Sequence, residues 1–291
     1  MCGLFGAIKL QGNKTISTKV VYRNGKEMES RGTHAVGWCQ SMLDNSLEYE
    51  KYEGATSTHK LHLKKALHNC QSLVGHTRFA THGSVTDSVN NHPHLYANAE
   101  VVGAVTHNGV ISHHEHIAKT NDLTMQGECD SEIIARLLES FDPELSLVER
   151  VADAVNECDD WDSIALAVLE SKGDVTDMVL VARGNPVKYS IHNGVLYYAS
   201  TSTMLPSTVQ TLKEGSILHI REGVGILDTV DGLLEEYATT GLTWQTYGAR
   251  SSTAKKVVKT CQPVQTRFDG HDSFDDYYLS NNIERDWYST M

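Results

Sequence analysis

The order of short apolar runs and amphipathic helices constrains the fold of this chain most strongly. Residues 1–9, 34–41, 71–80 and 100–106 have strand-like patterns, a modest helix is expected over 18–30, two clearer helices over 131–141 and 143–158, and strands again over 163–170, 178–182, 187–190, 195–199 and 216–220. Strands that alternate between apolar and polar residues bury one face, and helices with one apolar stripe pack on such a sheet. This order favours an α+β fold in which layers of mainly antiparallel sheet lie inside helical layers.

The remaining segments carry weaker patterns. Residues 83–98 are polar and rich in Asn and His, which is typical of a surface loop, and residues 203–212 are compatible with a short helix. After residue 223 the chain is polar and weakly periodic, with one plausible helix over 233–238. We therefore expect a first domain over residues 1–222 and a C-terminal extension of unknown role over residues 223–291.

Composition excludes several classes of function. A formal charge of −12 does not suit an extended nucleic-acid surface, which needs clustered Lys and Arg. No apolar run approaches the ~18 residues that a membrane-spanning helix needs, and the chain starts without a leader-like stretch. The six cysteines are scattered without a C-x-x-C pair, so neither a disulfide framework nor a cysteine zinc site is indicated. We expect a cytoplasmic protein with no nucleic-acid or membrane partner.

Cys2 follows the initiator methionine directly. Removal of Met1 would give this cysteine a free α-amine, whose pKa near ~7.7–8.0 suits a general base for the neighbouring thiol. Nucleophile and base would then belong to one residue, as in the pairing of threonine with an N-terminal amine. A cysteine in an apolar stretch can equally be a small buried hydrophobe.

Four local clusters hold further chemistry-bearing residues. They are Arg31-Gly32-Thr33-His34-Ala35, the stretch from Gly75 to Gly83 (GHTRFATHG), Thr106-His107-Asn108-Gly109, and Glu128-Cys129-Asp130-Ser131-Glu132. Each also has a structural explanation. Asn108-Gly109 is a hairpin-turn signal, Asp130 can cap a helix, and Arg78 at a strand end can form a surface ion pair.

Together with Cys2, these motifs resemble the class II glutamine amidotransferases. The resemblance runs from Cys2 to about residue 221 and implies the N-terminal nucleophile hydrolase fold, a four-layer αββα sandwich of two antiparallel sheets. It also implies hydrolysis of L-glutamine to glutamate and ammonia through a Cys2 thioester, with no cofactor. The catalytic group implied is Cys2 with an oxyanion hole formed by the Asn108 side chain and the Gly109 backbone N–H.

The resemblance implies substrate-binding and supporting residues as well. Arg78, with Thr81 and His82, would hold the α-carboxylate of glutamine, Asp130 would hold its α-ammonium, and Arg31 and Gly32 would support the site. A zwitterionic head group does need one cation and one anion, and a planar guanidinium suits a carboxylate. The segments Arg183-Gly184-Asn185-Pro186 and Tyr198-Ala199-Ser200 also look like the closing half of that family's fold.

The chain departs from the family in two places. Thr33-His34-Ala35-Val36-Gly37 stands where many members read Arg-Gly-Tyr-Asp-Ser-Ala-Gly, and Phe79 replaces a tryptophan common in the aminosugar-synthesising branch. Neither change removes a catalytic group, but both leave the branch open.

Three questions also stay open at this point. Members normally carry a second, synthase domain that uses the ammonia, and residues 223–291 are not expected to hold one. Either a separate synthase subunit therefore receives the ammonia, or hydrolysis of glutamine is the whole reaction. The substrate could instead be another γ-glutamyl amide, or the fold could serve as a non-catalytic interaction subunit. His92-Pro93-His94 and His113-His114-x-His116 could bind a metal, but they read as histidine-rich polar loops, so no metal is expected.

Overall fold

Two antiparallel sheets form the centre of the fold. The structure, a computed structural model, describes residues 2–11, 14–81, 83–99 and 101–230, all within residues 1–257, the first of the two units into which the chain divides. Sheet A has the strand order β11-β9-β10-β1-β4-β2-β3, and sheet B has the order β13-β12-β8-β7-β6-β5. Sheet A comprises β1 (Gly3–Lys9), β2 (Ala35–Ser41), β3 (Leu47–Glu53), β4 (Ser72–Arg78), β9 (Lys188–His192), β10 (Val195–Ala199) and β11 (Gln210–Thr211). Sheet B comprises β5 (His94–Asn98), β6 (Val101–Val110), β7 (Ser163–Lys172), β8 (Val175–Arg183), β12 (Ser216–Arg221) and β13 (Gly225–Val230).

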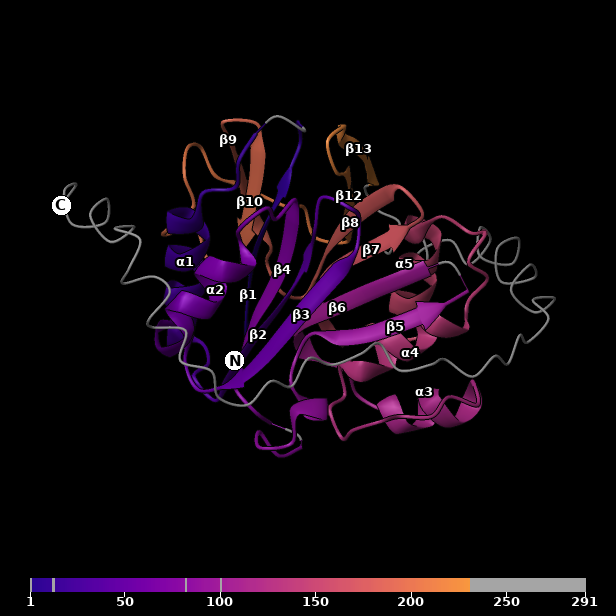
Figure 1. Cartoon of the computed structure of the whole chain (residues 1–291). Helices are drawn as coiled ribbons and strands as arrows, with labels where there is room; N and C mark the ends of the chain where they lie inside the picture. Colours follow the sequence, from indigo (N-terminus) through magenta and orange to yellow (C-terminus); the bar gives the residue numbers. More distant parts are fainter. Residues whose placement is uncertain (1, 12–13, 82, 100, 231–291) are drawn as a thin grey trace. The chain divides into compact units, whose positions relative to one another are not determined.

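Helices cover the outer face of each sheet. Sheet A is covered by α1 (Thr18–Glu27) and α2 (Lys60–Ala66), and sheet B by α3 (His114–Thr120), α4 (Glu132–Ser140) and α5 (Leu147–Asn156). Short 3-10 helices occupy Met28–Ser30, Thr56–His59 and Ser88–Asn90. Figure 1 shows the two groups of α-helices on opposite sides of the strands.

Three hydrophobic cores separate the four layers. The first joins α1 and α2 to sheet A, the second lies between the sheets, and the third joins sheet B to α3, α4 and α5. Successive side chains of a strand point to opposite faces, so the central strands are apolar throughout. In β7, for example, Leu166 and Val168 face the helices while Ala167 and Leu169 face sheet A. These layers confirm the expected α+β αββα sandwich.

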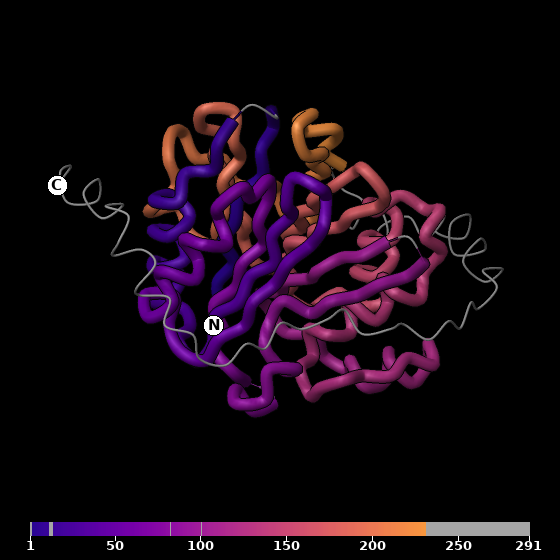
Figure 2. Tube along the Cα trace, in the orientation of Figure 1, coloured from indigo at the N-terminus to yellow at the C-terminus, as the bar shows by residue number. Residues whose placement is uncertain are grey.

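The first and the late strands of sheet A are neighbours in space. β1 pairs with β10 on one edge, with Phe5 opposite Ala199, and with β4 on the other, with Gly3 opposite Thr77. The tube in Figure 2 shows indigo and orange segments side by side for this reason. Residue 2 is thereby held at the end of β1, next to the end of β4.

Several sequence expectations require correction. The 83–98 segment is not a surface loop throughout, since it contains the 3-10 helix Ser88–Asn90 and β5, with His92 and His94 buried. The helix expected over 203–212 is wrong, because this segment runs through turns into β11, which pairs with β9. Sheet B continues past the boundary expected at residue 222, because β13 pairs with β12. The helix expected over 233–238 lies outside the described residues.

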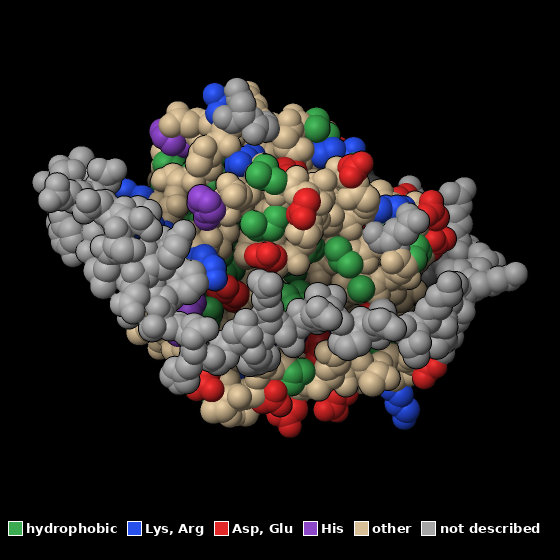
Figure 3. Space-filling model, in the orientation of Figure 1, with side chains coloured by type: hydrophobic (Ala, Val, Ile, Leu, Met, Phe, Trp, Pro, Cys, Tyr) green, Lys and Arg blue, Asp and Glu red, His purple; other side chains and the backbone are tan. Residues whose placement is uncertain are grey.

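The described surface is mixed in charge. On the face shown in Figure 3, acidic side chains gather along the lower edge, and Lys and Arg are scattered. Among the described residues, no helix combines the length and the apolar character that a bilayer crossing needs.

Candidate active site

Cys2 lies directly before β1, with its thiol against the end of β4. Its Sγ accepts a hydrogen bond from the Phe79 N–H at 3.4 Å and donates to the Phe79 carbonyl at 3.6 Å. Burial raises the pKa of the Cys2 thiol above its ordinary value, while the Phe79 N–H and the charge of Arg78 act in the opposite direction. The half-buried Cys2 thiol is thus protonated at neutral pH, and a base must remove its proton before it can act as a nucleophile.

Two side chains hold the carbonyl group of Cys2. Arg31 Nε donates to the Cys2 oxygen at 2.6 Å. With its amide nitrogen turned toward Cys2, Asn108 donates to the same oxygen at 3.0 Å and accepts from Arg31 NH2 at 3.2 Å. Because a side-chain amide has two N–H donors, the Cys2 carbonyl occupies only one of them. Arg31, which directly follows the 3-10 helix Met28–Ser30, and Asn108, from β6 of sheet B, thereby fix the backbone of Cys2.

Gly32 permits the close approach on which this arrangement depends. A Cβ at this position would lie 2.5 Å from the carbonyl carbon of Arg78 and 2.6 Å from the Phe79 nitrogen. Real Cβ atoms do not come so near to backbone, so any other residue would push the turn away from β4. Arg31 and Gly32 thus both lie next to Cys2 and the end of β4, and their supporting role stays a prediction.

Arg78 ends β4 and is only 3% exposed, so the surface ion-pair interpretation is wrong. Its Nη1 donates to Asn91 Oδ1 at 2.8 Å and to the Ser84 carbonyl at 3.3 Å, and its Nη2 donates to the Gly83 carbonyl at 3.2 Å. These neutral acceptors orient the guanidinium. A guanidinium held in a fixed orientation is suited to bind an anionic ligand.

Asn108 and Gly109 lie inside β6, opposite Ala165 and Ile164 of β7, so the hairpin-turn interpretation is wrong. A Cβ on Gly109 would lie 1.6 Å from the Ser163 carbonyl oxygen, which explains the glycine. Asn185 Nδ2 donates to the Asn108 carbonyl at 3.1 Å and fixes this end of the strand.

Asp130 is buried just before α4, but it does not cap that helix. The N-cap residue is Ser131, and Asp130 Oδ2 instead accepts from the Ile111 N–H at 2.8 Å, next to the end of β6. The helix-cap interpretation is therefore wrong. The charges of Asp130 and Arg78 are both felt at the Cys2 thiol, where Asp130 raises and Arg78 lowers the thiol pKa. One anion and one cation thus accompany the nucleophile.

The structure gives little information on the other two expected substrate-binding residues, Thr81 and His82. Thr81 is exposed in the bend that follows β4. His82 lies outside the described residues.

Three further residues support the site and were not singled out from the sequence. Asn91 orients Arg78, Asn185 holds Asn108, and Ser200 Oγ accepts from the Leu4 N–H at 2.9 Å beside the nucleophile. Asn185 and Ser200 lie in segments that the sequence had connected with the family, so a signal for them existed. Asn91 gave none, because only the folded loop brings it to Arg78.

Comparisons with known proteins show which family this chain is similar to. No family model matches the chain. The glutamine–fructose-6-phosphate aminotransferase (isomerizing) of Thermotoga maritima is 30% identical over 254 residues, which cover 84% of this chain and 39% of that protein. The enzyme of the same name from Pseudomonas syringae pv. tomato is 31% identical over 248 residues, 80% of this chain and 38% of that protein. The chain thus spans about two fifths of the length of these two curated relatives.

Solved structures show the same fold at lower identity. The glutamine phosphoribosylpyrophosphate amidotransferase of B. subtilis matches 79% of this chain, and 49% of its own, with a TM-score of 0.63 at 18% identity. A glutamine aminotransferase class-II domain protein from Silicibacter pomeroyi matches 79% of this chain, and 99% of its own, with a TM-score of 0.50 at 16% identity. The chain belongs to the class II glutamine amidotransferases. Its αββα sandwich is that of the N-terminal nucleophile hydrolases.

The two departures of this amidotransferase from its family meet at one place. The His34 ring stacks on the Phe79 ring with centroids 4.8 Å apart, and His34 Nδ1 accepts from the Ala80 N–H at 3.0 Å. Phe79 is 46% exposed, although its backbone binds the Cys2 thiol. The changed residues therefore form one aromatic pair beside the nucleophile, and the backbone contacts of the site are kept.

Proposed function

We propose that this chain hydrolyses the side-chain amide of L-glutamine with Cys2 as the nucleophile. The observation that carries the proposal is the geometry at Cys2, whose carbonyl accepts hydrogen bonds from Arg31 and Asn108 and whose thiol accepts one from the N–H of Phe79, the residue after Arg78. In this proposal Arg78 binds the α-carboxylate, with Thr81 and His82 assisting, and Asp130 binds the α-ammonium. The two charges then fix the head group and direct the amide toward the thiol.

The reaction would begin after removal of Met1. The α-amine of Cys2 takes the thiol proton, and the thiolate attacks the amide carbon to form a tetrahedral intermediate. Its oxyanion accepts hydrogen bonds from an Asn108 N–H and from the Gly109 N–H, a contribution worth roughly 10²–10³ in rate for each donor. The proton returns to the leaving nitrogen and ammonia departs. Water, deprotonated by the same amine, then cleaves the thioester and releases glutamate.

Support for Asn108 in this role comes from its position. Its amide bridges Arg31 and the Cys2 carbonyl, so its nitrogen lies beside the backbone of the nucleophile and is held in one orientation. A pre-oriented donor needs no reorganisation when charge develops, which is the basis of oxyanion stabilisation.

The finer proposal is that the ammonia passes to a separate acceptor enzyme. In the amidotransferase relatives, by their names, the amide nitrogen goes to fructose 6-phosphate. Co-purification of this chain with candidate synthases would identify the enzyme that receives the ammonia.

Labelling with a glutamine-shaped diazoketone tests the glutaminase proposal. The reagent alkylates a nucleophile only after it has bound in a glutamine pocket, so we expect one adduct per chain, on Cys2 without Met1, located by peptide mass spectrometry. Excess L-glutamine should suppress the adduct, whereas equal amounts of D-glutamine or L-asparagine should not. Larger γ-glutamyl amides as competitors test the substrate class.

Matched variants separate binding from chemistry in the same assay. Cys2→Ser should remove the adduct, and Asp130→Asn should weaken protection by glutamine while leaving the thiol reactive toward iodoacetamide. Cys158→Ser, which changes a buried cysteine of the third core, should label as the wild type does. An adduct elsewhere, or labelling that glutamine does not affect, would contradict the proposal.

A further inference from the structure

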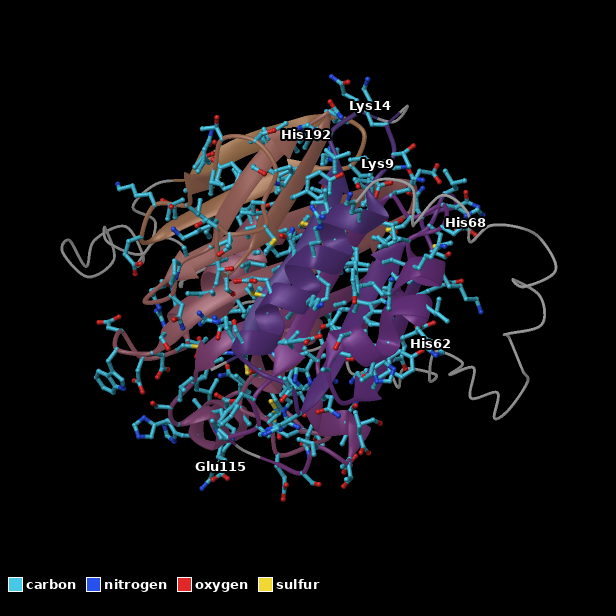
Figure 4. All side chains as sticks on the ribbon, turned by 90° about the vertical axis from the view of Figure 1, so that its left-hand side faces the viewer. Lys9, Lys14, His62, His68, Glu115 and His192 are labelled. Carbon is cyan, nitrogen blue, oxygen red and sulfur yellow. The ribbon has the colours of Figure 1, made fainter. Side chains whose placement is uncertain are left out.

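Three buried side chains with metal-ligating atoms lie together near the active site. His92 is 3% exposed, His94 is 3% exposed and Cys129 is 4% exposed. Their ligand atoms lie within 4.8 Å of one another. Figure 4 shows that histidines such as His62 and His192 lie at the surface, which is the ordinary place for this residue.

Three of the four ring nitrogens of these two histidines have no hydrogen-bond partner within the described part of the chain. His92 Nδ1, His92 Nε2 and His94 Nε2 are buried and have no hydrogen-bond partner there. Buried polar groups are normally paired, and each one left unpaired costs free energy of folding. Three unpaired nitrogens on two adjacent histidines, next to a thiol, are the donor set that a borderline-soft cation prefers.

We propose that His92, His94 and Cys129 form a binding site for a thiophilic divalent cation, with Zn²⁺ as the expected ion. Zn–N bonds of about 2.0–2.1 Å and Zn–S bonds of about 2.3 Å place tetrahedral ligand atoms roughly 3.3–3.7 Å apart. The three atoms therefore need to approach by only about an ångström, a movement within reach of side-chain rotation. On binding, the Cys129 proton leaves to solvent and the thiolate bonds to the metal.

Another histidine and several charged groups lie around the three proposed ligands. His76 packs on His92 with ring centroids 3.8 Å apart, and His76 Nε2 also has no partner among the described residues. The charges of Lys51, Arg136 and Arg78 reach His94, and they disfavour a dication. The Cys129 thiolate and the adjacent Asp130 carboxylate offset them, since Cys129 Sγ lies 3.8 Å from Asp130 Oδ1.

The site would join the two segments that carry the proposed head-group residues. His92 directly follows Asn91, which orients Arg78, and Cys129 directly precedes Asp130. A cation would thus tie the loop behind Arg78 to the segment before α4 and fix the distance between the two charges. This consequence rests on the proposed glutaminase function, whereas the metal site itself does not.

Titration of the full chain with Co²⁺ tests the site. Cobalt substitutes for zinc, and a thiolate ligand gives it an intense charge-transfer absorption, so binding and cysteine ligation are read together. After treatment with chelator and reductant, we expect one equivalent to bind with this absorption, and Zn²⁺ to displace it. Cys129→Ser should abolish the absorption, and His94→Gln should weaken binding by more than the roughly 10–100-fold cost of an outer-shell change.

Two controls exclude other thiols. Cys158→Ser should bind like the wild type, and so should Cys2→Ser, which removes the only alternative chelate formed by an α-amine and a neighbouring thiol. The proposal is overturned if the wild-type chain shows no stoichiometric binding, if the absorption survives in Cys129→Ser, or if it disappears in Cys2→Ser. If the chain bound the metal but showed no glutaminase activity, the proposed function would be contradicted and the metal site would stand.

Discussion

Gly32 shows how one missing side chain can position a nucleophile. Arg31 reaches the Cys2 carbonyl only because the next residue passes within contact distance of the Arg78–Phe79 peptide. The same peptide binds the Cys2 thiol, so the carbonyl clamp and the thiol contact share one close approach. Position 32 therefore requires glycine, because the gap between its backbone and the Arg78–Phe79 peptide leaves no room for a Cβ atom.

Gly32→Ala is expected to lower glutaminase kcat by about 10²-fold, the cost typical of a displacement near 1 Å at a reacting group. The measurement is steady-state ammonia release, together with thermal unfolding. Gly173→Ala is the control, since its Cβ meets nothing within 4 Å and its φ of +59° makes alanine costly only for stability. Equal activity losses in the two variants would show that Gly32 acts through stability instead.

The raised pKa of the Cys2 thiol predicts a direction of pH dependence. Burial favours the neutral thiol, so the thiolate fraction at neutral pH is small and grows as the pH rises toward and beyond the ordinary thiol value. Iodoacetamide labelling of Cys2 without substrate should therefore accelerate steadily with pH. Turnover should rise earlier, near the ~7.7–8.0 of an α-amine acting as base. If labelling and turnover showed the same dependence on pH, the α-amine of Cys2 would not be the general base.

At the scale of elements, the sequence predicted strands with two apolar faces and missed those with polar ones. β1, β6 and β7 were expected because their runs are apolar, but β3 (Leu47–Glu53) is an edge strand with mostly polar side chains. β5 was taken for loop because its histidines and asparagines are turn-forming in isolation, and their burial depends on contacts with distant residues. The sequence pointed to Cys2, Arg78, Asn108 and Asp130 because they lie in short motifs. Asn91 gave no such signal, because only tertiary contact brings it to Arg78.

The acidic face of α5 offers a prediction about stability. Burial, followed by repulsion from Glu149 and Glu157 one turn away on each side, raises the pKa of Asp153 to about 6. The folded state thus binds this proton more tightly than the unfolded chain, whose aspartate titrates near ~3.9. The stability of the fold should fall as the pH rises between these values, and the cost should persist above about pH 6.

Asp153→Asn is therefore expected to raise the melting temperature at pH 7.5 by a few degrees, since about 1 kcal/mol corresponds to roughly 2–4 °C in a fold of this size. The gain should vanish at pH 4, where wild-type Asp153 is protonated in the folded state. Asp174→Asn, in the exposed turn between β7 and β8, is the control and should change little at either pH. If Asp153→Asn raised the melting temperature equally at both pH values, removal of the carboxylate charge would not be the cause of the increase.

At the scale of the whole fold, the site exists only where the two sheets meet. Cys2, Arg31 and Arg78 belong to sheet A and its connections, whereas Asn108 and Gly109 belong to sheet B, so the core between the sheets sets the distance between the two halves. Ala165 lies in this core directly opposite Asn108 in the β6–β7 register. A larger side chain there would separate the sheets beside the Cys2 carbonyl clamp.

Ala165→Val tests this dependence against Ala154→Val, which adds the same two methyl groups to the core between α5 and sheet B. Both substitutions overpack a fully buried alanine and should cost about 1–3 kcal/mol in urea unfolding. Only Ala165→Val should also lower kcat, by about tenfold or more, because it alone moves Asn108 relative to Cys2. If both variants keep wild-type kcat despite equal destabilisation, the distance between the sheets does not limit the reaction, and the Arg31–Asn108 clamp holds the site by itself.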